Sequence, residues 1–188
     1  MGEIIAVTGN PGTGKKSVAP MIASRMGLGC LGLNELSLSH GLLDASKPDG
    51  DVDIRKLRSL VRKEVSGRVV VFGHLVPYAL EPRAVSKVAV LRCEPGVLRG
   101  RLAERGYPPR KLVDNVEAEL IGLVSSEAYE AFGGTRTFEI DTTHSTPAQA
   151  AQVAIGILRG TRAAPPRIDW TTSYDSAAKL RFLLTPGE

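Results

Sequence analysis

Apolar residues along the chain gather in short continuous runs, which are separated by longer stretches with helical spacing. The runs at residues 4–7, 69–72 and 88–91 are rich in Val and other strand-forming residues, a pattern typical of strands buried on both faces. A weaker run lies at 137–140. Residues 30–33 complete a set of five predicted strands, although the neighbouring glycines weaken this last prediction.

The intervening stretches place apolar residues at the three- and four-residue spacing of amphipathic helices. Predicted helices lie at about residues 17–26, 52–65, 95–105, 109–132 and 146–158. Short connections join the alternating strands and helices, which favours a parallel sheet covered by helices on both faces. The predicted fold class is therefore α/β.

Three segments depart from this alternation. Residues 34–50 are polar and carry Pro48, which indicates an excursion from the sheet. Gly106 and the prolines after Tyr107 interrupt a helical pattern that resumes at once, as in a short hinged flap. The tail from residue 163 onward lacks a long amphipathic pattern, and we expect its Trp170 to pack on the body of the protein.

The length of 188 residues favours one domain, predicted at residues 1–162, with residues 163–188 as a carboxy-terminal extension. No apolar run reaches the ~18 residues of a membrane span, and no secretory signal is visible. Cys30 and Cys93 are too few for a disulfide framework, so we expect buried thiols and a cytoplasmic location. The net charge of +4 suits an anionic ligand or an RNA-rich partner without proving either.

The strongest chemical signal is the segment Gly9-Asn10-Pro11-Gly12-Thr13-Gly14-Lys15-Lys16-Ser17, between a predicted strand and a predicted helix. Glycines allow consecutive backbone N–H groups to point at phosphate oxygens, and the helix directs the positive end of its dipole there. Lys15 can reach the β- and γ-phosphates of a nucleotide. The segment therefore predicts a P-loop that binds ATP.

One residue of this loop departs from the general pattern, in which Ser or Thr follows the lysine and binds Mg²⁺. Lys16 stands there instead, and the hydroxyl comes one residue later, at Ser17. Adenylate kinases as a group share this later hydroxyl, so the loop resembles that of a nucleoside monophosphate kinase.

Further segments resemble one divergent family, the archaeal and eukaryotic nuclear adenylate kinases (isoenzyme six in eukaryotes). They are the lid-like segment at residues 91–107 with residues 111–115, the strand at 69–72 that leads to His74, and the segment Ile168-Asp169-Trp170. The resemblance covers residues 3–170 and is poorest over 34–50.

This resemblance implies a P-loop NTPase fold with a five-stranded parallel sheet, and adenylate kinase and ATPase activity with ATP, AMP and Mg²⁺. It also implies a role in small ribosomal subunit and rRNA maturation, with small-subunit ribosomal protein eleven and pre-ribosomal particles as partners. Carried over by position, the ATP-binding residues are Gly12, Thr13, Gly14, Lys15, Lys16, Ser17 and Arg105, with Ser17 as the metal ligand. The monophosphate-binding segment falls at about 34–57 and the lid at about 104–114.

The predicted lid is rich in cations, which phosphoryl transfer requires to neutralise charge on the moving group. Arg105 stands beside the Gly106 hinge, and we expect it to close over the phosphates. Arg99 and Arg110 have the character of solvated helix residues. Together with Lys15 and His74, Arg105 makes up the predicted catalytic set.

Two residues at the end of the third strand bear on catalysis. Phe72 stands where the family has an aspartate that holds Mg²⁺ through water. This predicts weakened activity, the use of another acid such as Glu94, or lapsed activity with nucleotide binding retained. His74 occupies the family's histidine position and could orient water or contact the γ-phosphate. His40 and His144 show no metal-ligand spacing and are expected at the surface.

Two other functions remain open at this stage. The departures at Lys16 and Phe72 also suit a ribosome assembly factor that uses nucleotide as a conformational switch. The basic helix that begins near residue 52 could meet rRNA, or Arg55 and Arg58 could hold an AMP phosphate. A kinase of a small metabolite on the same fold is a third candidate.

Overall fold

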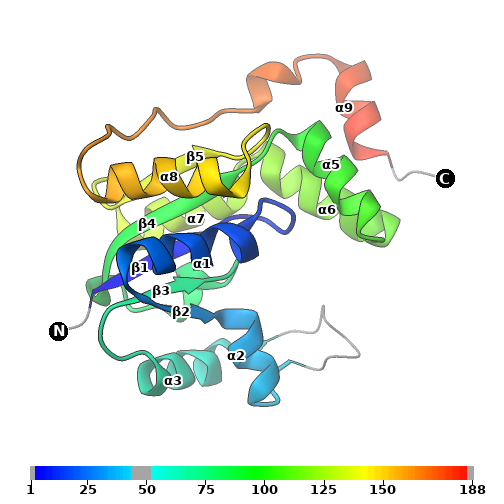
Figure 1. The fold of residues 1–188 in the computed structure, drawn as a ribbon. Helices are drawn as coiled ribbons and strands as arrows, with labels where there is room; N and C mark the ends of the chain where they lie inside the picture. Colours follow the sequence, from blue (N-terminus) through cyan, green and yellow to red (C-terminus); the bar gives the residue numbers. More distant parts are fainter. Residues whose placement is uncertain (1–2, 44–51, 186–188) are drawn as a thin grey trace.

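A computed structural model describes residues 3–43 and 52–185 and contains a five-stranded parallel sheet (Figure 1). Its strands are β1 (Ile4–Thr8), β2 (Gly29–Gly32), β3 (Val69–Phe72), β4 (Val85–Arg92) and β5 (Thr137–Asp141). They lie in the order β2-β3-β1-β4-β5, and each neighbouring pair is parallel. All five predicted strands and the α/β class are confirmed.

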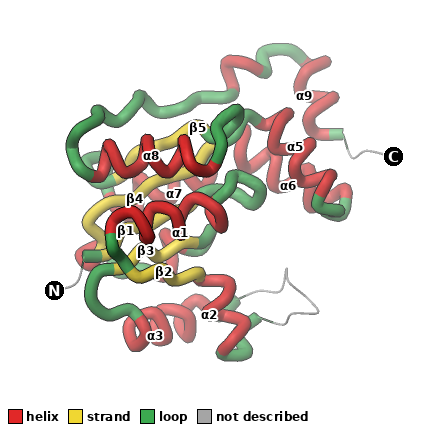
Figure 2. The backbone as a smooth tube through the Cα atoms, in the orientation of Figure 1, coloured by secondary structure: helices red, strands yellow, loops and turns green. Residues whose placement is uncertain are grey.

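Helices cover both faces of this sheet, as Figure 2 shows. Among the described residues, the α-helices are α1 (Lys15–Met26), α2 (Leu33–Ser39), α3 (Ile54–Glu64), α4 (Val76–Ala79), α5 (Pro95–Glu104), α6 (Pro109–Leu120), α7 (Leu123–Phe132), α8 (Pro147–Leu158) and α9 (Ala177–Leu184). Short 3-10 turns lie at Pro82–Ala84 and Thr171–Ser173.

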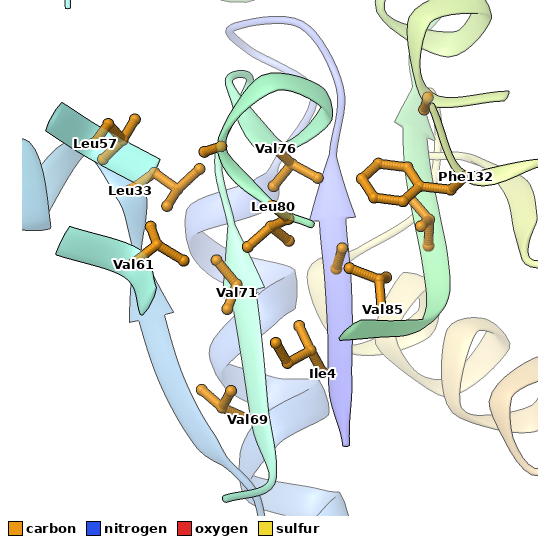
Figure 3. Packing of buried hydrophobic residues seen from close by; sticks show 14 of the residues in the cluster. Ile4, Leu33, Leu57, Val61, Val69, Val71, Val76, Leu80, Val85 and Phe132 are labelled. Carbon is orange, nitrogen blue, oxygen red and sulfur yellow. The ribbon is translucent and has the colours of Figure 1, made fainter. Parts of the chain in front are cut away.

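The continuous apolar strands are buried because their residues alternate between two cores. In β1, Ile4 and Ala6 join a core covered by α3, α4 and α7, which Figure 3 shows with Val76 and Phe132 reaching it from α4 and α7. Ile5 and Val7 join the opposite core, under α1 and α8. A third apolar cluster lies away from the sheet, between α5, α6 and α9.

The single helix predicted over 109–132 is wrong, since the chain forms α6 and α7 with a break at Gly122. Gly122 adopts a left-handed conformation with φ of 67°. A Cβ at this position would also lie 3.4 Å from the guanidinium nitrogens of Arg92. The glycine therefore ends α6 and lets the chain pass close to a buried arginine.

The polar excursion at 34–50 begins as α2, while the part of the predicted 34–57 segment at residues 44–51 lies outside the described residues. The tail packs on the third cluster. Trp170 is half-buried there, as predicted, and Leu183 of α9 is fully buried.

The two cysteines differ in environment. Cys93 is buried, as expected, but Cys30 is exposed, because it lies on β2 at the edge of the sheet. His40 and His144 are exposed, as predicted. Within residues 3–43 and 52–185, no helix has the length and apolar character needed to span a membrane.

The topology places a crevice at the carboxyl ends of β1 and β3. β1 leads into α1, which covers one face of the sheet, whereas β3 leads toward α4 on the other face. Loops that diverge in this way from neighbouring parallel strands leave a crevice, where ligands of α/β proteins usually bind.

Candidate functional site

A cavity of about 570 Å³ lies at this end of the sheet. Four parts of the chain line it: the P-loop, the start of α2 with Leu43 and Val52, the segment at 72–75 after β3, and the region around Arg105. The structure therefore brings the predicted site residues Gly12, Gly14, Lys15, Lys16, Ser17, His74 and Arg105 around one space.

Two positions of the P-loop require glycine, because of a close backbone approach and because of positive φ angles. Gly9, with φ of 137°, leaves no room for a side chain, because a Cβ would lie 2.3 Å from the carbonyl oxygen of Leu91. Gly14 adopts φ of 99° and begins α1 with no side-chain cap. The first N–H groups of α1 therefore have no capping side chain and suit an anion.

Lys15 is folded back onto the loop. Its Nζ donates to the carbonyl oxygens of Gly9 (2.6 Å) and Asn10 (2.8 Å). The pKa of this amine is lowered to about 7, mainly by desolvation; the charge of Glu119 opposes this shift, and the charges of Arg105 and Lys16 add to it. Phosphate oxygens would replace these carbonyls and favour the charged amine.

Asn10 and Thr13 fix the shape of the loop from the protein side. The Asn10 amide nitrogen donates to buried Glu119 (2.7 Å), and the Thr13 hydroxyl donates to the Asn10 carbonyl oxygen (2.8 Å). The Thr13 carbonyl accepts from Thr142 Oγ1 (3.0 Å). Thr13 is buried and does not line the cavity, so its side chain shapes the loop from behind.

The hydroxyl of Ser17 and the ammonium of Lys16 lie on the cavity side of α1 and are exposed. Lys16 Nζ forms an ion pair with Glu35 Oε1 at 3.0 Å. Glu35 is the only carboxylate among the described residues that line the cavity.

The end of β3 contributes an aromatic ring and an imidazole. Phe72 is half-buried and lines the cavity beside His74. Desolvation lowers the pKa of His74 to about 4, and the charge of Lys15 acts in the same direction. At neutral pH the imidazole is therefore uncharged and can accept a proton or a hydrogen bond.

Only part of the predicted cationic lid faces the cavity. Arg105 and Lys111 line it, and Gly106 between them has φ of 71°. Arg99 instead donates to the carbonyl oxygens of Leu183 and Thr185, each at 3.0 Å, and so anchors the tail. Neither Arg99 nor Arg110 lines the cavity. Arg110 is exposed, as expected, but the interpretation of Arg99 as a solvated residue is wrong, because it is half-buried against the tail.

The suggestion that Glu94 replaces the missing aspartate is wrong. Its Oε2 accepts from the backbone N–H of Val97 (2.8 Å) and so caps α5, while its Oε1 accepts from the Tyr174 hydroxyl. Glu94 does not line the cavity. A residue that directly precedes a helix-starting proline is well placed to cap that helix, which explains the role it has.

Sequence reasoning missed Glu119, Glu35 and Asn115. The signal for Glu119 was available, because Leu112, Val116 and Leu120 mark the apolar face of α6 and Glu119 falls on that face. Glu35 and Asn115 are isolated polar residues on α2 and α6. They line the cavity because these helices lie next to the P-loop, which the sequence pattern does not indicate.

Comparison with known proteins adds close relatives. A family described as "AAA domain" matches residues 5–122. A protein of Thermococcus onnurineus named "Putative adenylate kinase" is 36% identical over 182 residues, which is 96% of this chain and 98% of the relative. A protein of the same name from Methanothermobacter thermautotrophicus is 39% identical, over 87% of this chain and 94% of its own.

Solved structures support the fold. Shikimate kinase from Acinetobacter baumannii superposes with a TM-score of 0.63 at 14% identity, covering 86% of this chain and 95% of that one. A gluconokinase from Sinorhizobium meliloti gives a TM-score of 0.52 at 19% identity, covering 93% and 97%. At these identities the likeness concerns the P-loop kinase fold alone.

Proposed function

Since this chain belongs to the archaeal adenylate kinase family, we propose that it transfers the γ-phosphoryl group of ATP to AMP and forms two ADP. Family membership supports a kinase-like phosphotransferase that acts on a nucleoside monophosphate. The choice of AMP and a slow ATPase activity in its absence are parts of the proposal.

The observation that carries this proposal is the shared cavity. The P-loop, the monophosphate-side residues Asn34, Leu43 and Val52, and the lid residue Arg105 all line one space of about 570 Å³. A kinase that transfers a phosphoryl group from one nucleotide to another needs a donor site and an acceptor site that meet at the transferred group. Residues from both predicted nucleotide-binding regions line this cavity, which supports the proposal.

Lys15 and Arg105 have complementary tasks in the proposed reaction. Lys15 leaves the two loop carbonyls and binds the β- and γ-phosphates beside the N–H groups at the start of α1. Arg105 is exposed next to the Gly106 hinge, so it can close over the phosphates and neutralise charge that moves with the phosphoryl group. Neutral His74 accepts a hydrogen bond from the acceptor or from water.

The described residues could hold Mg²⁺ only together with the phosphates of ATP, because they supply few ligands of their own. No group of three or more His, Cys, Asp or Glu side chains gathers as a metal site in residues 3–43 and 52–185. Ser17 would supply a hydroxyl ligand, and Glu35 would hold metal-bound water, because it is the cavity's carboxylate in the described parts. When bound with ATP, the ion neutralises charge on the β- and γ-phosphates.

A coupled assay of ADP formation from ATP and AMP tests the proposal. We expect ADP formation that depends on both nucleotides and is abolished in Lys15→Met. ADP formation at the same rate without AMP would support an ATPase instead. No ADP in either condition would overturn the proposed reaction.

A second function, in maturation of the small ribosomal subunit, is proposed alongside the first. Helix α3 supports it, because Arg55, Lys56 and Lys63 present an exposed basic surface suited to rRNA. The Phe72 position supports it as well, since slow chemistry is compatible with a nucleotide-driven switch. Affinity capture from an archaeal lysate should recover small-subunit ribosomal protein eleven or pre-ribosomal particles, and capture of neither would contradict this role.

A further inference from the structure

Glu119 is a buried carboxylate that no step of the proposed reaction uses. Only 1% of its surface is exposed, and it lies near the end of α6. Its two oxygens accept from different parts of the protein. Oε2 accepts from the Asn10 amide at 2.7 Å, whereas Oε1 accepts from Arg92 Nε at 2.7 Å, Cys93 N at 3.0 Å and Trp170 Nε1 at 3.3 Å.

Oε2 of Glu119 contacts the P-loop through the side chain of Asn10. The backbone carbonyl of Asn10 accepts from Thr13 N (3.3 Å), from Thr13 Oγ1 (2.8 Å) and from Lys15 Nζ (2.8 Å). The Asn10 side chain is therefore the link between the buried carboxylate and the group that positions Lys15. If this link is lost, the loop loses a buried side-chain hydrogen bond to α6.

The other oxygen faces the carboxy-terminal tail. Trp170 donates to it from a half-buried position, and the tail backbone at Ile168 completes the surrounding network. Ile168 N donates to Glu139 Oε2 at 2.6 Å, and Ile168 O accepts from Arg92 at 3.2 Å. Arg92, which is 2% exposed, thus bridges Glu119, Glu139 and the tail.

We propose that Glu119 is a positioning residue for the P-loop, and that the tail at residues 168–170 completes the nucleotide site by holding the far side of the same carboxylate. The proposal rests on the proposed function, since it concerns the same ATP site. It assigns a role to the tail, which is joined to the P-loop by hydrogen bonds through this carboxylate.

The physical reason lies in the cost of an unpaired buried charge. A carboxylate removed from water keeps one geometry only when donors surround it, and each donor restricts the others. Removing the Trp170 donor frees Glu119 to reorient toward Arg92 and Cys93. The Asn10 amide then loses its fixed acceptor, so the P-loop becomes less ordered before nucleotide binds.

Three variants separate this coupling from ordinary tail packing. Trp170→Phe removes one N–H and keeps an aromatic ring, and Asn10→Ala removes the opposite donor. Tyr174→Phe is the matched control, because Tyr174 docks the same tail through Gly96 N at 3.0 Å and through Glu94 but does not contact Glu119. Calorimetry gives the ATP affinity, hydrogen exchange reports on residues 9–17 without nucleotide, and denaturation gives stability.

We expect Asn10→Ala to raise the Kd for ATP about tenfold and Trp170→Phe to raise it about threefold, with faster exchange in the P-loop. The double variant should be no weaker than Asn10→Ala alone, because both changes act through one carboxylate. Tyr174→Phe should lower stability as much as Trp170→Phe does, yet leave the P-loop exchange and ATP affinity unchanged.

The proposal is overturned if Trp170→Phe leaves P-loop exchange at the wild-type rate, or if the two effects on Kd multiply in the double variant. It is also overturned if Tyr174→Phe disturbs the P-loop as strongly as Trp170→Phe. Wild-type protein that fails to bind ATP would instead contradict the proposed function. In that case, hydrogen exchange of residues 9–17 measured without nucleotide would still show whether Trp170 affects the order of the P-loop.

Discussion

The ammonium of Lys16 lies 3.0 Å from the carboxylate Oε1 of Glu35, and this ion pair joins the first turn of α1 to α2 at the cavity. The other oxygen of Glu35, Oε2, lies close to Gly32. A Cβ added to Gly32 would lie 2.0 Å from this oxygen and 2.8 Å from Phe72 Cζ. The carboxylate therefore lies beside Phe72, where the family resemblance implies an aspartate. Lys16 and Phe72, the two residues that set this sequence apart from the expected pattern, therefore both lie next to Glu35.

Replacing Glu35 by Gln should raise the Mg²⁺ concentration needed for half-maximal activity by about tenfold, since outer ligands of a metal typically contribute 10- to 100-fold. Calorimetric titration of Mg²⁺ into the ATP-bound protein should show the same loss of affinity. Glu104→Gln serves as the control, because Glu104 is exposed and does not line the cavity. Equal Mg²⁺ requirements in the two variants would exclude Glu35 from metal binding.

Replacing Phe72 by Asp should increase ADP formation by about tenfold or more, because the new carboxylate can hold metal-bound water next to Ser17. Phe72 is half-buried, lines the cavity and lies at the end of β3, so the substitution should leave the fold intact. The coupled assay at saturating ATP and AMP measures the gain. An unchanged rate in a folded variant would show that metal handling does not limit this protein.

His74 should make stability dependent on pH. Its folded-state pKa is lowered to about 4 from the ordinary 6.5, mainly by desolvation. Between these values the unfolded chain binds a proton that the folded protein does not, so stability falls as pH falls from 7 toward 4. Urea unfolding at pH 7 and pH 5 should show about 1–2 kcal/mol less pH-dependent loss in His74→Gln. Identical slopes in both proteins would contradict the assignment.

Arg105 and Arg110 offer a matched pair on either side of the lid hinge. Both are exposed, but only Arg105 lines the cavity. Arg105→Ala should reduce kcat by about 100-fold or more, as expected for an arginine that neutralises transferred charge. Arg110→Ala should change kcat by less than about twofold. Similar losses in both variants would indicate a general electrostatic effect in place of lid closure.

The features of the fold and of the candidate site that could be predicted from the sequence are those set by local pattern. Continuous apolar runs predicted β1, β3 and β4, weaker patterns predicted β2 and β5, and the spacing of Gly9, Gly14 and Lys15 predicted the P-loop. Gly122 was the missed signal for the break between α6 and α7, since one glycine in a helical pattern is usually tolerated.

The rest depends on contacts between distant segments. Glu94 follows a strand in the pattern of a metal-binding acid, but the tail brings Tyr174 to it. Cys30 lies in a strand, and only the strand order reveals that β2 is at the exposed edge. The bond between Asn10 and Glu119 spans 109 residues. No local pattern predicts such a partner.

Calorimetric titration of ATP with Mg²⁺ into wild-type protein and Lys15→Met would show whether the P-loop binds the nucleotide's phosphates. Lys15 gives up two carbonyl contacts to reach phosphate, so its loss removes a charged donor from the site. We predict one ATP per wild-type chain and a Kd at least about 100-fold higher in Lys15→Met. Equal affinity in the two proteins, or no binding by wild type at millimolar ATP, would contradict the account.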